Sequence, residues 1–131
     1  VQDGQSTTLV VVDINAKDEK VCQLKSLGVE VFQLDYSQED WLGDLLKYLA
    51  SRGVIRLMVE GGSKINTLFF EYRRINQLHL FIAPKVIGGE ESVSLLSGEG
   101  IASMDSAMRL DERHYERCDD DIYITGIPIW S

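Results

Sequence analysis

The sequence predicts an α/β fold, in which a mostly parallel sheet is flanked by helices and followed by a C-terminal antiparallel hairpin. Between residues 8 and 72, three apolar runs are each followed by a segment with helical spacing. Strands that alternate with helices along a chain favour parallel pairing through right-handed crossovers. Later in the chain, two long runs surround the acidic pair Asp119-Asp120, a pattern typical of an antiparallel hairpin.

The first strand and helix are predicted over residues 8–12 and 15–27. Residues 8–12 are all β-branched or apolar, as expected for a parallel strand that is buried on both faces. Asn15 has the right chemistry to cap the helix, and Gly28 to end it. The apolar residues that share one face of this helix are Val21, Leu24 and Leu27.

A second strand is predicted over residues 29–34, and a second helix follows it. Ser37 and Asp40 have the spacing of a capping box at the start of this helix, with Asp in place of the usual Glu or Gln. Gly53 is placed to end the helix. Its apolar face contains Trp41, Leu42, Leu45, Leu46 and Leu49.

The third strand and helix surround two glycines. Residues 55–59 are apolar apart from Arg56, so they predict another buried parallel strand. Gly61 and Gly62 allow a sharp turn without a Cβ in the way of a ligand, and the first turn of the next helix would offer N–H groups to a phosphate. A tight turn without a ligand is the alternative, because the motif is neither a G-x-G-x-x-G fingerprint nor a Walker loop. The apolar face of this helix contains Ile65, Leu68, Phe69 and Tyr72.

The C-terminal part of the chain predicts three further strands. Residues 78–82 alternate between apolar and other side chains, and Pro84 ends the run. Residues 85–100 are rich in glycine and serine and predict irregular structure. Residues 107–117 and 121–127 predict the two strands of the hairpin.

The length and composition of the chain limit the classes of function that it can have. At 131 residues the chain predicts one domain, 1–131, with an ordinary apolar fraction of 44%. The net charge of −8 argues against a nucleic-acid surface and a polybasic membrane patch. No run approaches the roughly 20 apolar residues of a membrane span, and there is no signal-peptide pattern. Cys22 and Cys118 lack the paired spacing of a metal or redox motif, so buried thiols in a reducing compartment are expected.

Several polar residues are open to two interpretations. Glu60 ends the third predicted strand, where open α/β sheets place their ligands. Ser63 is suited to donate to a phosphate or to cap the helix, and Lys85 to neutralise a phosphate or to lie in water. His79 is expected to be a hydrogen-bonded structural histidine, with a catalytic acid as the alternative.

Two acidic clusters, Glu90-Glu91 and residues 119–121, invite comparison with calcium sites. Both lack the alternating oxygen ligands and the glycine of an EF-hand loop. They are therefore expected to be solvated turns, and no metal site is predicted.

Three segments resemble, in order and spacing, the reductase domain of riboflavin biosynthesis, a module often fused behind a pyrimidine deaminase. They are Met58-Val59-Glu60-Gly61-Gly62 with Asn66 and Phe70-Glu71, Leu78-His79-Leu80-Phe81-Ile82-Ala83-Pro84-Lys85-Val86-Ile87-Gly88-Gly89, and Asp120-Asp121-Ile122-Tyr123-Ile124-Thr125-Gly126. The second segment, with its Ala-Pro-Lys ending and nearby Gly-Gly, is the most specific. The resemblance covers residues 8–127 and implies a dihydrofolate-reductase-like fold.

The resemblance implies an NADPH-dependent reduction, in which the ribosyl group of an aminopyrimidine ribosylamine 5′-phosphate becomes the ribityl form. It implies that Glu60 contacts the substrate, and it identifies no catalytic residue. The cofactor contacts that it implies are Gly61, Gly62, Ser63, Lys64, Ile65, Asn66, Thr67 and Leu68. Because the nicotinamide supplies the hydride, the protein would mainly position two anionic ligands and exclude water.

The resemblance also implies further polypeptide before residue 8, so the sequence is expected to be an incomplete reductase domain. The expected partners are the phosphorylated pyrimidine substrate, a fused or separate deaminase and a second copy in a homodimer, with no nucleic acid and no membrane. The expected compartment is the cytoplasm, or the plastid in a plant. A non-catalytic dimerisation or regulatory module of the same fold is the competing interpretation.

Overall fold

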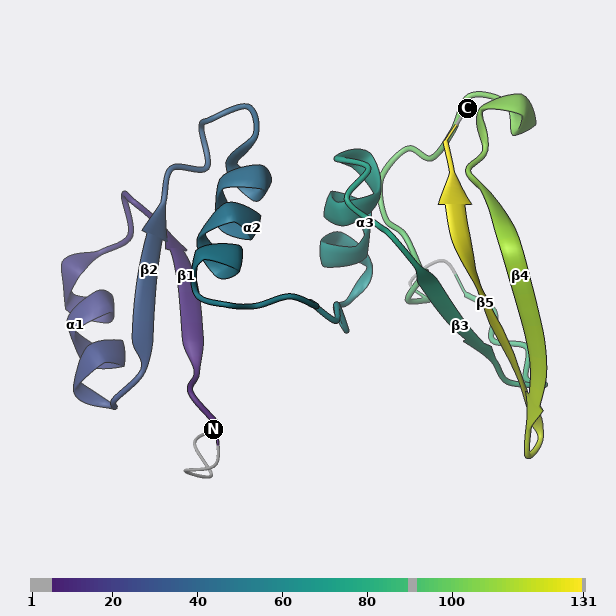
Figure 1. The fold of residues 1–131 in the computed structure, drawn as a ribbon, viewed down its shortest axis with the longest axis horizontal. Helices are drawn as coiled ribbons and strands as arrows, with labels where there is room; N and C mark the ends of the chain where they lie inside the picture. The colour runs from purple at the N-terminus through teal and green to yellow at the C-terminus, as the bar shows by residue number, and fades with distance from the viewer. Residues whose placement is uncertain (1–5, 90–91, 131) are drawn as a thin grey trace. The chain divides into compact units, whose positions relative to one another are not determined.

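The computed structural model describes residues 6–89 and 92–130 of the chain (Figure 1). The chain divides into two compact units, Val1–Leu57 and Met58–Ser131. One unit contains a sheet of two parallel strands, and the other contains a sheet of three antiparallel strands. The described residues contain both helices and sheets, so the protein is of the α/β class. No helix in these described ranges is long and apolar enough to cross a lipid bilayer.

The first unit contains β1 (Leu9–Asp13), α1 (Asp18–Ser26), β2 (Glu30–Leu34) and α2 (Trp41–Ser51). Helix α1 connects the two strands, which lie parallel and side by side in Figure 1. Their register places Val11 opposite Phe32. The small core of this unit consists of Val21, Leu34 and Leu42, of which Leu42 is fully buried.

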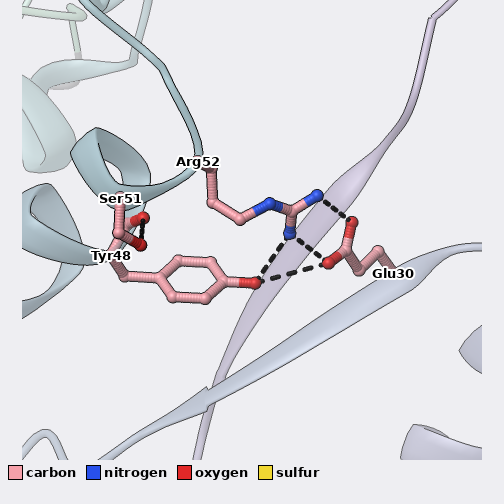
Figure 2. Close-up of polar contacts among 4 residues, drawn as sticks. All are labelled: Glu30, Tyr48, Ser51 and Arg52. Atoms are coloured by element: carbon pink, nitrogen blue, oxygen red, sulfur yellow. Dashed lines mark hydrogen bonds and ion pairs between the residues drawn. The ribbon is translucent and has the colours of Figure 1, made fainter.

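Helix α2 is fastened to β2 by stacked rings and by an ion pair. The rings of Phe32 and Tyr48 stack with 3.7 Å between their centroids. The Arg52 guanidinium donates to both carboxylate oxygens of Glu30 and to the Tyr48 hydroxyl, as Figure 2 shows. The hydrogen bond from Arg52 lowers the pKa of the Glu30 carboxyl, and the same contact raises the pKa of Arg52.

The start of α1 differs from the predicted one. Lys17 is the residue before the helix, and its side chain caps nothing. Asn15 lies in the preceding turn, where its backbone N–H donates to Asp13 Oδ1 at 2.8 Å. The predicted Asn15 cap is therefore wrong, because Asp13 at the end of β1 holds Asn15 in a turn of its own.

The start of α2 is also capped differently. Asp40 itself is the cap, because its carboxylate accepts the Gly43 N–H at 3.1 Å, so the capping box from Ser37 is wrong. The predicted helix ends are confirmed. Gly28 and Gly53 follow α1 and α2 with φ of +76° and +84°, a backbone conformation that favours glycine.

The second unit contains α3 (Ser63–Glu71), β3 (Leu78–Ile82), the short 3-10 helix η1 (Met104–Ser106), β4 (Arg109–Cys118) and β5 (Asp121–Ile129). Strand β5 lies between β3 and β4 and is antiparallel to both. The predicted hairpin is confirmed, and Asp119 turns β4 into β5 with φ of +53°. A bulge in β4 lies opposite Gly126, where an added Cβ would lie 2.9 Å from the Asp111 carbonyl oxygen.

The prediction of a mostly parallel sheet is wrong for the described residues. The parallel pairing is confined to β1 and β2, and the larger sheet is antiparallel. Residues 55–59, predicted as the third parallel strand, form no strand. In this run Ile55 is fully exposed and Met58 is 77% exposed. An apolar run becomes a strand where a neighbour completes its backbone hydrogen bonds, and no described strand pairs with this one.

Candidate functional site

The predicted site residues lie at the start of the second unit, where an extended segment enters α3. Gly62 is the residue before the helix, with φ of −71° and ψ of 174°. Its carbonyl oxygen accepts the N–H of Ile65 at 3.0 Å and the N–H of Asn66 at 3.2 Å. Gly62 therefore begins the helical hydrogen-bond pattern, as predicted from the sequence.

Two N–H groups at this helix start are available to a ligand. The helix has no side-chain cap. Within residues 6–89 and 92–130, no acceptor contacts the backbone N–H of Ser63 or of Lys64. N–H groups at a helix start, together with the positive end of the helix dipole, favour an anion such as a phosphate.

The two glycines are present for different reasons. A Cβ added at Gly61 would lie 2.6 Å from Ile65 Cβ, so the close return of α3 onto the loop requires glycine there. A Cβ added at Gly62 would meet no atom within 4 Å, and its φ is accessible to any residue. Neither packing nor backbone strain within the described chain accounts for Gly62, whereas close approach of a ligand would.

The charged residues of the loop are exposed. Glu60 directly precedes the glycines, and its carboxylate makes no hydrogen bond with the described residues. Lys64 in the first turn of α3 is the one basic residue between positions 60 and 68. An exposed carboxylate and an exposed ammonium thus lie on either side of the helix start, where both can contact a bound molecule.

Asn66 and Thr67, predicted to contact the cofactor, have side chains that form hydrogen bonds within the protein. Asn66 Nδ2 donates to the Leu95 carbonyl oxygen at 3.2 Å. Thr67 Oγ1 accepts the Ser97 N–H at 2.7 Å. The sequence spacing could not identify these contacts, because they join segments about 30 residues apart.

Ile65 and Leu68 have apolar side chains, so any polar contact with a cofactor would come from their backbone.

Further along α3, the ring of Phe70 packs edge-on against Trp130, with 5.1 Å between centroids. The Arg73 guanidinium lies 5.7 Å from the same Trp130 ring. These contacts join the end of α3 to the residue that follows β5.

His79 makes a side-chain hydrogen bond, as expected from the sequence, with a partner that the sequence did not identify. Its Nδ1 lies 2.6 Å from the Tyr123 hydroxyl, and the Phe81 ring lies 4.9 Å from the Tyr123 ring. The Tyr123 side chain thus packs against Phe81 and hydrogen-bonds to His79. The sequence placed His79 and Tyr123 in predicted strands. It did not predict the antiparallel register of β3 and β5 that brings the two side chains together.

The carboxyl ends of β1 and β2 carry two aspartates that the sequence analysis did not single out. Asp13 accepts the N–H of Asn15 at 2.8 Å and the N–H of Tyr36 at 3.2 Å, and the hydrogen bond from Asn15 lowers the pKa of its carboxyl. Asp35 accepts from Ser37, and this side-chain hydrogen bond lowers the pKa of Asp35. Both carboxylates hold turns together. An Asp at the end of a strand, with Asn or Ser two residues later, is the turn signal that could have identified them.

Of the two acidic clusters, the one at residues 119–121 lies within the described residues, whereas Glu90 and Glu91 lie outside them. Asp119 and Asp120 form the β4–β5 turn, and Asp121 begins β5. No group of three or more His, Cys, Asp or Glu side chains in the described ranges could hold a metal ion. Cys22 is exposed and Cys118 is half-buried, so the prediction of buried thiols is wrong for Cys22.

A shallow hollow of about 560 Å³ lies on the sheet of the second unit. It is lined by Leu80, Arg109, Leu110, Asp111, Arg113, Tyr115, Ile124 and Ile129. None of these residues belongs to the loop at 60–68. The loop remains the better candidate site, because the helix start after it has two backbone N–H groups without an acceptor among the described residues.

A family model described as the RibD C-terminal domain matches residues 1–124 of the chain. The riboflavin biosynthesis protein RibD of Bacillus amyloliquefaciens is 32% identical over 126 residues, which make up 96% of this chain and 34% of that protein. The 2,5-diamino-6-ribosylamino-4(3H)-pyrimidinone 5′-phosphate reductase of Aquifex aeolicus is 32% identical over 114 residues, 86% of this chain and 50% of that protein. The chain therefore spans a third to a half of the length of these curated relatives.

Two solved structures have a similar fold. A pyrimidine reductase-like protein of Corynebacterium diphtheriae gives a TM-score of 0.73 at 23% identity, and the match covers 94% of this chain and 50% of that one. RibD of Acinetobacter baumannii gives a TM-score of 0.71 at 21% identity, covering 92% of this chain and 31% of that one. At these identities the likeness establishes a shared fold.

Proposed function

Because the chain belongs to the RibD C-terminal domain family, we propose that it is part of a reductase domain of riboflavin biosynthesis. The proposed reaction is the NADPH-dependent reduction of the ribosyl group of an aminopyrimidine ribosylamine 5′-phosphate to the ribityl form. The observation that carries the proposal is the pair of available N–H groups at the start of α3, directly after Glu60-Gly61-Gly62. A phosphorylated nicotinamide cofactor suits such a site.

The cofactor would be held mainly by backbone groups. The N–H groups of Ser63 and Lys64 would bind its diphosphate, and Gly62 would let the backbone approach closely. Lys64 would add a positive charge beside the same phosphates. The nicotinamide supplies the hydride, so the task of this loop is to fix the cofactor in position.

Glu60 would bind the substrate. Its exposed carboxylate can accept hydrogen bonds from sugar hydroxyls or from an amino group of the pyrimidine ring. Since it directly precedes the phosphate-binding turn, it would bring the substrate close to the cofactor. This role is positioning, and no residue is assigned to proton transfer.

The wider assignment includes the family's architecture and partners. We place the chain in a single dihydrofolate-reductase-like domain of a longer polypeptide, acting as a homodimer with a fused or separate deaminase. Its compartment would be the cytoplasm, or the plastid in a plant. The longer lengths of the curated relatives support this view of the domain.

Titration with nicotinamide nucleotides tests the proposal. NADPH is expected to bind, whereas adenosine, which has no phosphates, is expected not to bind because the loop recognises the diphosphate. Glu60→Gln should leave the NADPH affinity within about twofold, because a rim charge that does not contact the diphosphate contributes little to binding. A chain that binds neither compound would contradict the reductase assignment and favour the non-catalytic dimerisation or regulatory module.

A further inference from the structure

The side of α3 that carries Asn66 and Thr67 holds a second segment of the chain, residues 95–97. Asn66 Nδ2 donates to the Leu95 carbonyl oxygen at 3.2 Å. The Ser97 N–H donates to Thr67 Oγ1 at 2.7 Å. This segment belongs to the glycine- and serine-rich connection between β3 and β4, so α3 fixes part of an otherwise irregular loop.

The Thr67 hydroxyl also joins this segment to the first turn of α3. It donates to the Ser63 carbonyl oxygen at 2.8 Å while its oxygen accepts from Ser97. Ser63 and Thr67 are four residues apart and therefore share one face of the helix. Ser97 consequently lies within two hydrogen-bond lengths of the turn that offers its N–H groups to an anion.

The Thr67 side chain is suited to connect Ser63 and Ser97 in a fixed arrangement. The χ1 angle of threonine in a helix is restricted, and its Oγ1 can bond the carbonyl four residues earlier, which aims the remaining lone pair outward. Removal of the Thr67 hydroxyl would leave the Ser97 N–H without its acceptor. Because Ser97 is half-buried, water would replace this hydrogen bond poorly. The Ser97 hydroxyl lies 3.2 Å from the same Thr67 oxygen.

We infer that Thr67 and Asn66 are positioning residues, which hold residues 95–97 as a second wall beside the phosphate-binding turn of α3. This inference rests on the proposed function. It replaces direct cofactor contact by these two side chains with an indirect role. The wall places the Ser97 hydroxyl 3.2 Å from Thr67 Oγ1, one helical turn from Ser63, and this hydroxyl would contact a phosphate bound at the helix start.

Substitutions at position 67 separate the bridge from the shape of the side chain. Thr67→Val keeps the shape and removes the acceptor, whereas Thr67→Ser keeps the hydroxyl. Ser51→Ala is the matched control, because the Ser51 hydroxyl makes the same kind of local bond, to the Tyr48 carbonyl oxygen at 2.7 Å, without holding a second segment (Figure 2). The measurements are hydrogen exchange of the Ser97 amide by NMR, the NADPH dissociation constant and the thermal midpoint of each variant.

Thr67→Val is expected to speed exchange of the Ser97 amide and to weaken NADPH binding, each by about tenfold, as the loss of one ordinary hydrogen bond would produce. Thr67→Ser should restore both values to within about twofold, and Ser51→Ala should change neither. An unchanged exchange rate of the Ser97 amide in Thr67→Val would show that Thr67 does not hold this segment. Faster exchange with unchanged NADPH affinity would overturn the positioning role. Absence of NADPH binding in the unsubstituted chain would overturn the proposed function, and the positioning role with it, before any substitution is compared.

Discussion

Two apolar runs of equal length behave differently in this protein. Strand β1 pairs with β2 along its whole length, and each of its residues is half-buried. Residues 55–59 have a similar composition, yet they form no strand, and Ile55 is fully exposed. The comparison teaches that an apolar pattern gives a segment the capacity to form a strand, whereas a paired neighbour decides whether it does.

The paired run is supported by side chains that the unpaired run lacks. Leu34 and Leu42 are buried in the unit that contains β1, and Arg52 ties α2 to β2 through Glu30. The unpaired run leads instead into the glycine turn and the exposed Glu60. In this molecule the stabilising contacts and the candidate ligand-binding residues are thus concentrated in different segments.

The largest effect on stability is expected from Leu42→Ala in the paired region. Leu42 is fully buried, so its truncation leaves a cavity and should lower the free energy of unfolding by about 2–5 kcal/mol. Ile55→Ala in the unpaired run is the control, because Ile55 belongs to the same unit as Leu42. Ile55 is fully exposed, and its substitution should change that free energy by less than about 0.5 kcal/mol.

Tryptophan fluorescence can report on the first unit alone in a Trp130→Phe background. Trp41 lies in the first unit and Trp130 in the second, and phenylalanine preserves a ring beside Phe70. Urea titrations of Leu42→Ala and Ile55→Ala in this background give the two free energies, because both residues lie in the first unit. Equal losses would mean that residues 55–59 are as well packed as the core around Leu42, and the contrast between the paired and the unpaired run would not hold.

The sequence predicted features that one residue type determines locally. Gly28 and Gly53 end their helices because φ values of +76° and +84° suit glycine better than any other residue. Asp119 was predicted to lie in a turn between two strands, and it does. Such features depend on the backbone preference of a residue and little on the rest of the chain.

The sequence could not predict features that depend on a distant partner. Whether residues 55–59 pair depends on a neighbouring strand, and the link from Thr67 to Ser97 depends on the path of a loop 30 residues away. Which residue caps a helix also depends on the surrounding structure. Asn15 and Asp40 both suit a helix start, but the preceding turn leaves only Asp40 facing a free N–H.

A smaller, pH-dependent effect is expected from the tie between α2 and β2. The hydrogen bond from Arg52 holds the pKa of Glu30 below its ordinary value of 4.5. A carboxyl with a lowered pKa in the folded state stabilises the fold above its unfolded pKa, and this contribution is lost as the pH falls through the folded value. Glu30→Gln should therefore lower the urea midpoint at pH 7, and the difference from the unsubstituted chain should shrink below about pH 4.5.

Asp44→Asn provides the matched control for this tie. It removes the ion pair of Asp44 with Lys47, 2.7 Å long, which lies on the same helix and is more exposed to solvent. Exposed pairs contribute little, so this variant should shift the midpoint less than Glu30→Gln at pH 7. A Glu30→Gln difference that stays constant from pH 7 to pH 3 would show that the carboxylate charge does not contribute to the tie.

Only a small effect on stability is expected at the glycine that packing does not require. In Gly62→Val the new side chain would meet no atom of the described chain, and φ of −71° suits valine. The free energy of unfolding should therefore change by less than about 1 kcal/mol. The NADPH affinity should nevertheless fall by more than about tenfold, because a branched side chain would occupy the space that a phosphate needs to approach the N–H groups of Ser63 and Lys64.

Gly61→Val is the comparison that separates the roles of the two glycines. A Cβ at position 61 would lie 2.6 Å from Ile65 Cβ, so this variant should lose stability because α3 must move away from the loop. The thermal midpoint and the NADPH affinity should both fall in Gly61→Val, whereas the affinity alone should fall in Gly62→Val. If a folded Gly62→Val bound NADPH as tightly as the unsubstituted chain, the phosphate would have to bind elsewhere, and the turn before α3 would be a purely structural connection.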